Sequence, residues 1–276
     1  MRMIEEVRFR NTTNRFQQRL KEDIRKIRKS RNIIVQADKT RNMYEVSEQQ
    51  YEKLLTNNIT KNYKLTQPKT YDSINQEAKE IAQSMKIDDR VECMAKREAY
   101  ITLKDHKENF TTALPCRLIN PAKSNIGVIS KSILDRILAD IQRKLQVNMW
   151  ENTNAVTKWF TQLPQKQRCT FISFDIVDFY PSITEELLKN ALDFARRYTS
   201  ISQEETEIIF HARKSMLFGL EKEWVKKGTG LFDVPMGCYD GAEICGLIGT
   251  FALATLVERL NKGSIGLYRD DGLVAF

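Results

Sequence analysis

Two short segments of the chain carry aspartates in a setting that suits metal-dependent chemistry. Residues 171–183, Phe-Ile-Ser-Phe-Asp-Ile-Val-Asp-Phe-Tyr-Pro-Ser-Ile, place Asp175 at the end of an apolar strand pattern, and residues 266–276 place Asp270 and Asp271 in the turn of a predicted hairpin. A strand that is buried on one face rarely carries an aspartate unless the carboxylate has a charged partner or a metal. Carboxylates that meet from separate strands suit Mg²⁺, and two such ions can support phosphoryl transfer between nucleotides.

Each segment also has an ordinary interpretation. Asp175 alone could be a helix N-cap or a turn residue, and Asp271-Gly272 matches a common hairpin turn. Two adjacent acids in a tight turn repel each other unless they are solvated or bound to cations. The joint pattern favours a metal site, and this interpretation requires the fold to bring the carboxyl of Asp175 beside those of Asp270 and Asp271.

Composition and charge describe a globular protein with one strongly basic region. The chain has 276 residues, of which 41% are hydrophobic and 29% charged, enough for a large core and two subdomains. The net charge is +8, and residues 1–41 hold 13 lysines and arginines against 5 acids, whereas the remaining residues balance. We expect this N-terminal block to be a phosphate-facing arm or a solvated basic helix.

Several classes of protein are disfavoured. The five cysteines include no Cys-x-x-Cys pair and there are two histidines, so we expect no zinc site and no disulfide framework, with reduced and mostly buried cysteines. The N-terminus lacks an apolar secretory core, and the apolar stretch 244–257 is too short to span a bilayer. We expect an intracellular protein, nuclear or cytoplasmic, without a membrane partner.

Helical and strand patterns are mixed without regular alternation. This predicts an α+β fold in which a small antiparallel sheet is backed by helices. Capping boxes are predicted at Ser47, Ser182 and Ser202. Helices are expected over 16–29, 47–55, 73–85, 130–147 and 242–260, and strands over 33–35, 99–103, 116–120 and 171–175, with a turn at 226–228 and a terminal hairpin.

The two acidic segments carry a resemblance to a known family. Phe-Asp-Ile-Val-Asp-Phe-Tyr-Pro-Ser-Ile resembles the first palm motif of reverse transcriptases, and Tyr-Arg-Asp-Asp resembles their Tyr-x-Asp-Asp motif. From about Ala37 to Phe276 the chain is similar to these enzymes, and more narrowly to the Penelope-like retroelement type. The resemblance implies a right-hand polymerase palm with a mixed fingers subdomain and no thumb. It assigns residues 1–36 to a basic arm, 37–165 to the fingers and 166–276 to the palm, with part of 185–230 as an alternative part of the fingers.

The resemblance also implies roles for the acidic residues. Asp175, Asp270 and Asp271 are expected to be catalytic and to hold two Mg²⁺ ions, with Mn²⁺ as an alternative. The backbone carbonyl of Ile176 is expected to complete one metal shell. Tyr180 falls where the family places a steric gate that excludes a ribose 2′-hydroxyl, although it could equally be a core aromatic.

A third segment, residues 234–241, resembles the family's Pro-Gln-Gly motif. The motif implies that Met236 and Gly237 pack against the template base and the incoming nucleotide, because glycine lets the backbone approach closely. Met236 replaces the usual glutamine, and Asp240-Gly241 stands where many relatives have Ser-Pro.

The fingers are expected to bring cations to the triphosphate. Arg117, in Cys-Arg-Leu-Ile-Asn, resembles the family's Arg-Pro-Ile motif with Leu118 in place of proline. Lys104 and Lys107 could supply a second cation, and Ala-Asp-Lys at 37–39 resembles a Penelope-like fingers motif. The alternative for each is a solvated surface charge.

The resemblance predicts a retroelement RNA-directed DNA polymerase acting on an RNA template, a DNA primer and deoxynucleoside triphosphates. Because the sequence stops five residues after Asp271, we expect a truncated reading frame or a fragment that could be inactive. One alternative is a catalytically silent nucleic-acid-binding remnant. Another is an RNA-dependent RNA polymerase, which Tyr180 disfavours because a steric gate there would exclude ribonucleotides. The sequence does not specify the oligomeric state.

Overall fold

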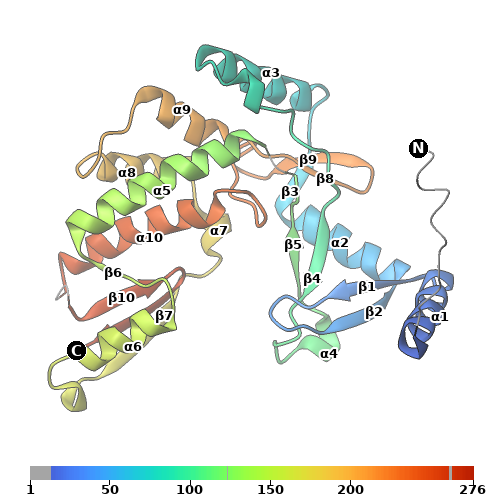
Figure 1. The fold of residues 1–276 in the computed structure, drawn as a ribbon, viewed down its shortest axis with the longest axis horizontal. Coiled ribbons are helices and arrows are strands. Elements are labelled where there is room, and N and C mark those ends of the chain that lie inside the picture. Colours follow the sequence, from blue (N-terminus) through green and yellow to red (C-terminus); the bar gives the residue numbers. More distant parts are fainter. Residues whose placement is uncertain (1–13, 123, 261–262) are drawn as a thin grey trace. The chain divides into compact units, whose positions relative to one another are not determined.

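The computed structural model describes residues 14–122, 124–260 and 263–276 (Figure 1). The chain forms two compact units. The first combines the described chain up to Asn57 with Ile101–Arg117, and the second combines Asn58–Tyr100 with Leu118–Phe276. Helices and small sheets are mixed, so the α+β class predicted from the sequence is confirmed. The subdomain boundaries expected from the resemblance stay predictions.

The first unit contains a β hairpin joined to a second strand pair. β1 (Asn32–Gln36) pairs antiparallel with β2 (Met43–Ser47), a strand that the sequence analysis did not predict. β4 (Tyr100–Leu103) pairs with β5 (Cys116–Ile119), and both of these strands were expected from the sequence. A parallel bridge between Ala37 and Leu103 connects the two pairs. The segment that follows β1 and the segment that follows β4 therefore begin side by side.

The helix α1 (Arg15–Lys29) matches the helix predicted over 16–29. It begins with a capping box between Asn14 and Gln17. None of its side chains is buried, and its apolar row is exposed, including 73% of Phe16 and 42% of Ile24. Apolar periodicity predicted the helix correctly, but within the described residues that row packs into no core.

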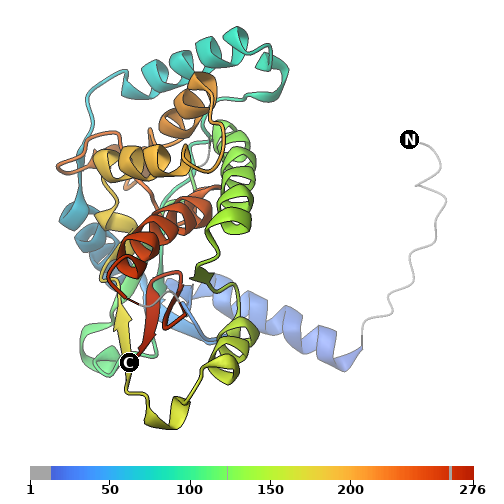
Figure 2. The same ribbon diagram turned by 90° about the vertical axis from the view of Figure 1, so that its left-hand side faces the viewer.

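A four-stranded sheet lies in the second unit, in the order β6-β10-β11-β7. Its members are β6 (Asn148–Met149), β7 (Phe171–Asp175), β10 (Ile265–Tyr268) and β11 (Asp271–Ala275). The pairs are antiparallel except that of β6 with β10, which is parallel. In Figure 2 the yellow strand β7 runs beside the red strand β11.

Each face of this sheet is covered by a different element. Leu253 of α10 (Gly241–Val257) packs with Leu267 and Val274 on one face. On the other face Ala275 packs with Trp150 and with Trp159 of α6 (Thr153–Gln162). Because side chains alternate along a strand, Phe174 faces α10 and Asp175 faces the opposite side.

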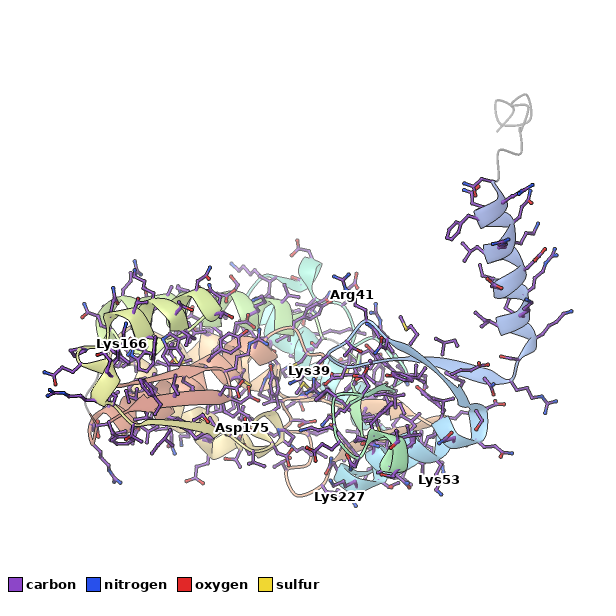
Figure 3. The ribbon with its side chains drawn as sticks, turned by 90° about the horizontal axis from the view of Figure 1, so that it is seen from below. Lys39, Arg41, Lys53, Lys166, Asp175 and Lys227 are labelled. Atoms are coloured by element: carbon purple, nitrogen blue, oxygen red, sulfur yellow. The ribbon has the colours of Figure 1, made fainter. Side chains whose placement is uncertain are left out.

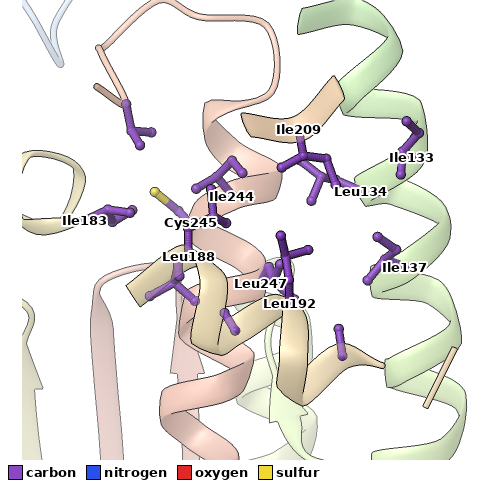
Figure 4. Packing of buried hydrophobic residues seen from close by; sticks show 14 of the residues in the cluster. Ile133, Leu134, Ile137, Ile183, Leu188, Leu192, Ile209, Ile244, Cys245 and Leu247 are labelled. Atoms are coloured by element: carbon purple, nitrogen blue, oxygen red, sulfur yellow. The ribbon is translucent and has the colours of Figure 1, made fainter. Parts of the chain in front are cut away.

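The largest core is formed by helices, as Figure 4 shows for α5, α8, α9 and α10. Besides α10, these helices are α5 (Ile126–Leu145), α8 (Glu185–Ala195) and α9 (Gln203–His211). Ile133, Ile137 and Ile141 repeat every fourth residue on α5 and are buried. This confirms the buried helix predicted near 130–147.

Shorter elements complete the two units. β3 (Tyr63–Leu65), β9 (Lys222–Lys226) and β8 (Leu217–Gly219) form a three-stranded sheet in that order. The remaining elements are α2 (Glu48–Asn62), α3 (Thr70–Ser84), α4 (Phe110–Ala113) and α7 (Phe179–Ser182), with 3₁₀ turns at Asp88–Arg90 and Lys166–Arg168. No helix in the described part of the chain has the length and apolarity to cross a bilayer.

Some local predictions are wrong for identifiable reasons. Ser182 does not cap a helix: its hydroxyl donates to the Phe179 carbonyl inside α7, and Thr184 caps α8 instead. The predicted capping box at Ser202 is confirmed. The cysteines are not mostly buried, because only Cys245 is buried and Cys93 is exposed.

Gly272 generates a prediction about the sheet. A Cβ at this position would lie 2.0 Å from Cζ of Phe174, the residue directly opposite on β7. Gly272→Ala must therefore displace the ring, and we expect the free energy of unfolding to fall by about 1–3 kcal/mol in urea titrations. The double variant Gly272→Ala with Phe174→Leu should recover part of the loss. An unchanged urea midpoint for the single variant would contradict this packing.

Candidate active site

The strand register brings two of the predicted acidic residues face to face. Asp175 ends β7, Asp271 begins β11, and the two are Cα partners in the antiparallel ladder. Directly opposite residues point to the same face of a sheet, with Cβ atoms about 4.5–5.5 Å apart. The requirement that the Asp175 carboxyl lie beside the carboxyl of Asp271 is therefore met by the backbone itself.

The hydrogen-bond pattern brings these side chains closer still. At the adjacent pair, the Ile176 amide donates to the Asp270 carbonyl over 2.9 Å. Hydrogen-bonded and non-hydrogen-bonded pairs alternate along an antiparallel ladder, so Asp175 and Asp271 form a non-hydrogen-bonded pair. In such pairs the Cα atoms approach to about 4.5 Å, and the side chains are nearer to each other than in the hydrogen-bonded pairs.

The hairpin turn has two residues, Arg269 and Asp270, because Tyr268 and Asp271 are the last paired residues. Arg269 has a φ of +56°, the left-handed conformation that such short turns use. The predicted turn at Asp270 is thus confirmed, but Asp271 already belongs to β11. Gly272 lies inside that strand, which excludes the ordinary Asp-Gly turn.

The three carboxylates are at least partly open to solvent, and their role as metal ligands stays a prediction. Asp175 and Asp271 are exposed and Asp270 is half-buried. None of the three forms an ion pair with a described basic side chain. Like charges directly opposite on a sheet destabilise it, and a bound divalent cation would remove that repulsion. In the described part of the chain, no group of three or more His, Cys, Asp or Glu side chains is arranged to hold a metal ion.

Tyr180 lies on α7, immediately beyond β7. It is half-buried, and its ring is so close to the start of α10 that a Cβ on Gly241 would lie 3.2 Å from Cε1. Burial raises the pKa of the Tyr180 hydroxyl, and a hydrogen bond with Cys245 contributes to the rise. Burial likewise raises the pKa of the Cys245 thiol, to about 12. The tyrosine therefore stays neutral at physiological pH.

The segment that resembles the Pro-Gln-Gly motif is fastened to the end of β5. The Asn120 amide donates to the Met236 carbonyl over 3.0 Å. Gly237 has a φ of +114°, and a Cβ there would lie 2.6 Å from the Asn120 carbonyl oxygen. Only glycine accepts both constraints. The close approach that the structure shows at Gly237 is to Asn120, and the predicted approach to a template base and nucleotide stays a prediction.

A buried ion pair lies beneath this loop. Asp240 accepts from Arg213, and both side chains are fully buried. Ser130 on α5 donates to the other Asp240 oxygen over 2.5 Å. Arg213 also donates to Cys238 Sγ at 3.9 Å. The Asp240-Gly241 departure from Ser-Pro thus has a structural partner, because the acid is matched by Arg213.

Sequence reasoning missed Arg213 and Asn120. Nothing in the spacing of Arg213 distinguishes it from the many surface arginines. Asn120 follows β5 and precedes a proline, and only the tertiary contact shows that it anchors Met236. The unexpected Asp240 was the one feature of the sequence that pointed to a buried basic partner, because a buried acid needs a counter-charge.

The predicted nucleotide-binding cations belong to the first unit. Arg117 is half-buried and forms an ion pair with Asp38 over 2.7 Å. Lys104 is half-buried and Lys107 is exposed. The three aspartates, Tyr180, Met236 and Gly237 all belong to the second unit. The roles predicted for all of these residues stay predictions.

The fold is similar to that of two telomerases of known structure. The chain is similar to telomerase from Candida albicans in complex with a fragment of telomeric RNA, with a TM-score of 0.60, 11% identity and coverage of 97% of this chain. It is also similar to apo telomerase from Candida tropicalis truncated from its C-terminal domain, with a TM-score of 0.57, 12% identity and coverage of 88%.

The chain spans about half of these telomerase chains, 49% and 52% of their lengths. The RNA-dependent RNA polymerase of a human picobirnavirus gives a lower TM-score of 0.44 at 11% identity, covering 94% of this chain and 58% of its own. No protein-family model and no curated protein matches the sequence. At these identities the similarity establishes the fold.

The buried pair generates a stability prediction. Asp240→Asn leaves the Arg213 guanidinium buried without its counter-charge, and we expect a loss of about 3–5 kcal/mol in the free energy of unfolding. The double variant Arg213→Met with Asp240→Leu should cost much less, because both buried charges are removed together. Urea unfolding followed by circular dichroism measures both. If the free energy of unfolding of Asp240→Asn lies within about 1 kcal/mol of the wild-type value, the ion pair does not stabilise the core as expected.

Proposed function

We propose that this chain carries the active site of an RNA-directed DNA polymerase. The observation that supports the proposal best is the direct opposition of Asp175 and Asp271 on a non-hydrogen-bonded pair, with Asp270 in the adjoining turn. This arrangement lies in a chain with a reverse-transcriptase-like fold. Joining nucleotides needs concentrated negative charge that can bind cations and little acid–base machinery.

In this proposal Asp175 and Asp270 hold the metal ions, Asp271 assists, and the Ile176 carbonyl completes one shell. Mg²⁺ suits these donors because all are hard oxygen atoms, and Mn²⁺ could replace it. When bound, two such ions lower the pKa of the attacking hydroxyl and stabilise the leaving oxygen. The protein's own part is to hold the carboxylates in register through β7 and β11.

The other predicted residues would position substrate. Tyr180 would sit against the sugar of the incoming nucleotide and exclude a 2′-hydroxyl. Met236 and Gly237 would support the template base, on a backbone held by Asn120. Positioning of this kind contributes most of the catalysis in phosphoryl transfer.

The substrates would be an RNA template, a DNA primer and deoxynucleoside triphosphates, with arginine and lysine side chains of the first unit neutralising the triphosphate. The motif resemblance supports a retroelement origin of the Penelope-like type. A second candidate is a catalytically silent nucleic-acid-binding protein. The exposed helix α1 favours it, because its basic side chains are open to solvent and could contact phosphates.

Primer extension on a poly-rA template with an oligo-dT primer and Mg²⁺ tests the proposal. Asp175→Asn or Asp270→Asn should lower the rate at least about 100-fold, because each removes charge where cations must bind. Asp178→Asn is the matched control: it is exposed, three residues from Asp175, and left-handed at φ +50°, which asparagine tolerates. It should leave the rate unchanged.

Retained RNA binding by wild type without any incorporation would instead support the silent nucleic-acid-binding protein. Incorporation that survives Asp175→Asn would remove the assigned site. Circular dichroism should confirm that each variant folds.

Tyr180 allows a separate test of sugar selectivity. Replacing the ring in Tyr180→Ala should lower the preference for deoxynucleotides over ribonucleotides at least about tenfold, measured as the ratio of the two kcat/KM values. Tyr180→Phe keeps the ring and loses only the hydroxyl that faces Cys245, so its preference should match wild type. An unchanged ratio in Tyr180→Ala would show that the tyrosine is a core aromatic, and a wild type that prefers ribonucleotides would point to an RNA polymerase.

A further inference from the structure

We propose that Asp38 is a positioning residue that holds the Arg117 guanidinium ready for the phosphates of an incoming nucleotide. This inference rests on the proposed function, and it concerns a residue to which no role has been assigned. It is carried by contacts within the first unit alone, where Asp38 and Arg117 come from strand pairs that are far apart in sequence.

In this ion pair a buried carboxylate holds one edge of a partly exposed guanidinium. Arg117 Nη1 donates to Asp38 Oδ1 over 2.7 Å. The Asp38 side chain is only 6% exposed, whereas that of Arg117 is 31% exposed. A guanidinium has five N–H donors in a rigid plane, so one edge can be held while the remaining donors stay available to phosphate oxygens.

Asp38 is itself held in a rigid place. Its backbone amide donates to the Leu103 carbonyl over 2.8 Å, beside the bridge between Ala37 and Leu103. Ala37 and Leu103 are both buried. The second carboxylate oxygen, Oδ2, is buried and has no hydrogen-bond partner among the described residues. A desolvated, half-satisfied carboxylate is costly, and such costs are typical of functional sites rather than of ordinary surface ion pairs.

A second acid fixes the surrounding loops. Asp105 Oδ2 accepts from Thr40 over 2.5 Å and from Asn42 and Tyr44 over 3.0 Å each. These bonds, with that from Thr40 first, lower the pKa of Asp105, so the carboxylate stays ionised. It ties the segment after β1 to the segment after β4.

The tied segments carry exposed cations. Lys39 and Arg41 are exposed on the turn between β1 and β2, where Figure 3 labels them, and Lys107 is exposed on the other segment. Exposed cations on two fastened loops, together with a guanidinium that Asp38 holds, suit a polyphosphate better than a single anion. The chemistry matches the triphosphate of a nucleotide.

The direction in which the anion Kd changes when Asp38 is removed shows whether Asp38 positions Arg117 or acts only through its charge. Asp38 is negative, so if it acted only through its charge, its removal would strengthen the attraction of the exposed cations for anions. If it positions Arg117, its removal frees the guanidinium and weakens anion binding, because the ordering of that side chain must then be supplied on binding. The two readings predict opposite changes in Kd.

Isothermal titration of the whole chain with inorganic tripolyphosphate is the direct test. We expect Asp38→Ala to raise Kd about tenfold, Arg117→Ala to raise it similarly, and the double variant to add little more, because the residues act as one unit. Glu108→Ala is the matched control, since it removes an exposed acid from the same segment and should lower Kd slightly or leave it unchanged. Asp38→Asn keeps an acceptor for Arg117 and should fall between wild type and Asp38→Ala.

Three outcomes would overturn the inference: a wild type that binds no tripolyphosphate, an Asp38→Ala variant with an unchanged or lower Kd, or fully additive effects of the two alanine variants. Should Asp38→Ala fail to fold by circular dichroism, Asp38→Asn takes its place with the same sign expected.

Primer extension distinguishes this inference from the proposed function. If wild type extends primers, Asp38→Ala should raise KM for the deoxynucleoside triphosphate more than it lowers kcat. If wild type extends nothing while the titrations follow the expected order, the polymerase proposal fails and the positioning role stands. If extension is normal and neither Kd nor KM changes in Asp38→Ala, the positioning role fails alone.

Discussion

The register between β7 and β11 is the constraint on which the candidate site depends. It places Asp175 opposite Asp271 on one face and Phe174 opposite Gly272 on the other. A shift of one residue would send every side chain of β7 to the wrong face and separate the carboxylates. The contact between the Phe174 ring and Gly272 resists such a shift, because no other residue at position 272 leaves room for the ring.

The helical core and the buried ion pair support this sheet from one side. α10 packs Leu253 against the sheet and begins at Gly241, beside Tyr180. The pair of Arg213 and Asp240 joins the start of α10 to the chain that leads into β8. The same helix therefore links the strand that carries the acids, the tyrosine and the loop at Met236. A change in its packing would reach all three.

Charge is organised differently in the two units. In the second unit, the opposed acids Asp175 and Asp271 form no ion pair with a basic side chain of the described residues. In the first unit, two acids hold basic neighbours and loops in place: Asp38 holds Arg117, and Asp105 fastens the loop at Thr40.

The sequence by itself determined the fold class, the buried helix α5, the strand that ends at Asp175 and the hairpin at Asp270, because apolar periodicity and acidic strand ends are local signals. The left-handed turn at Arg269, the pairing of Asp175 with Asp271 and the burial of Arg213 were decided by tertiary structure. Contacts between residues far apart in the chain leave no local pattern, so a surface charge and a buried charge look alike until a partner is found. Only the tertiary structure shows that Asp240 forms an ion pair with Arg213 and that Arg117 forms one with Asp38. It also shows that Asp175 lies opposite Asp271 in the sheet.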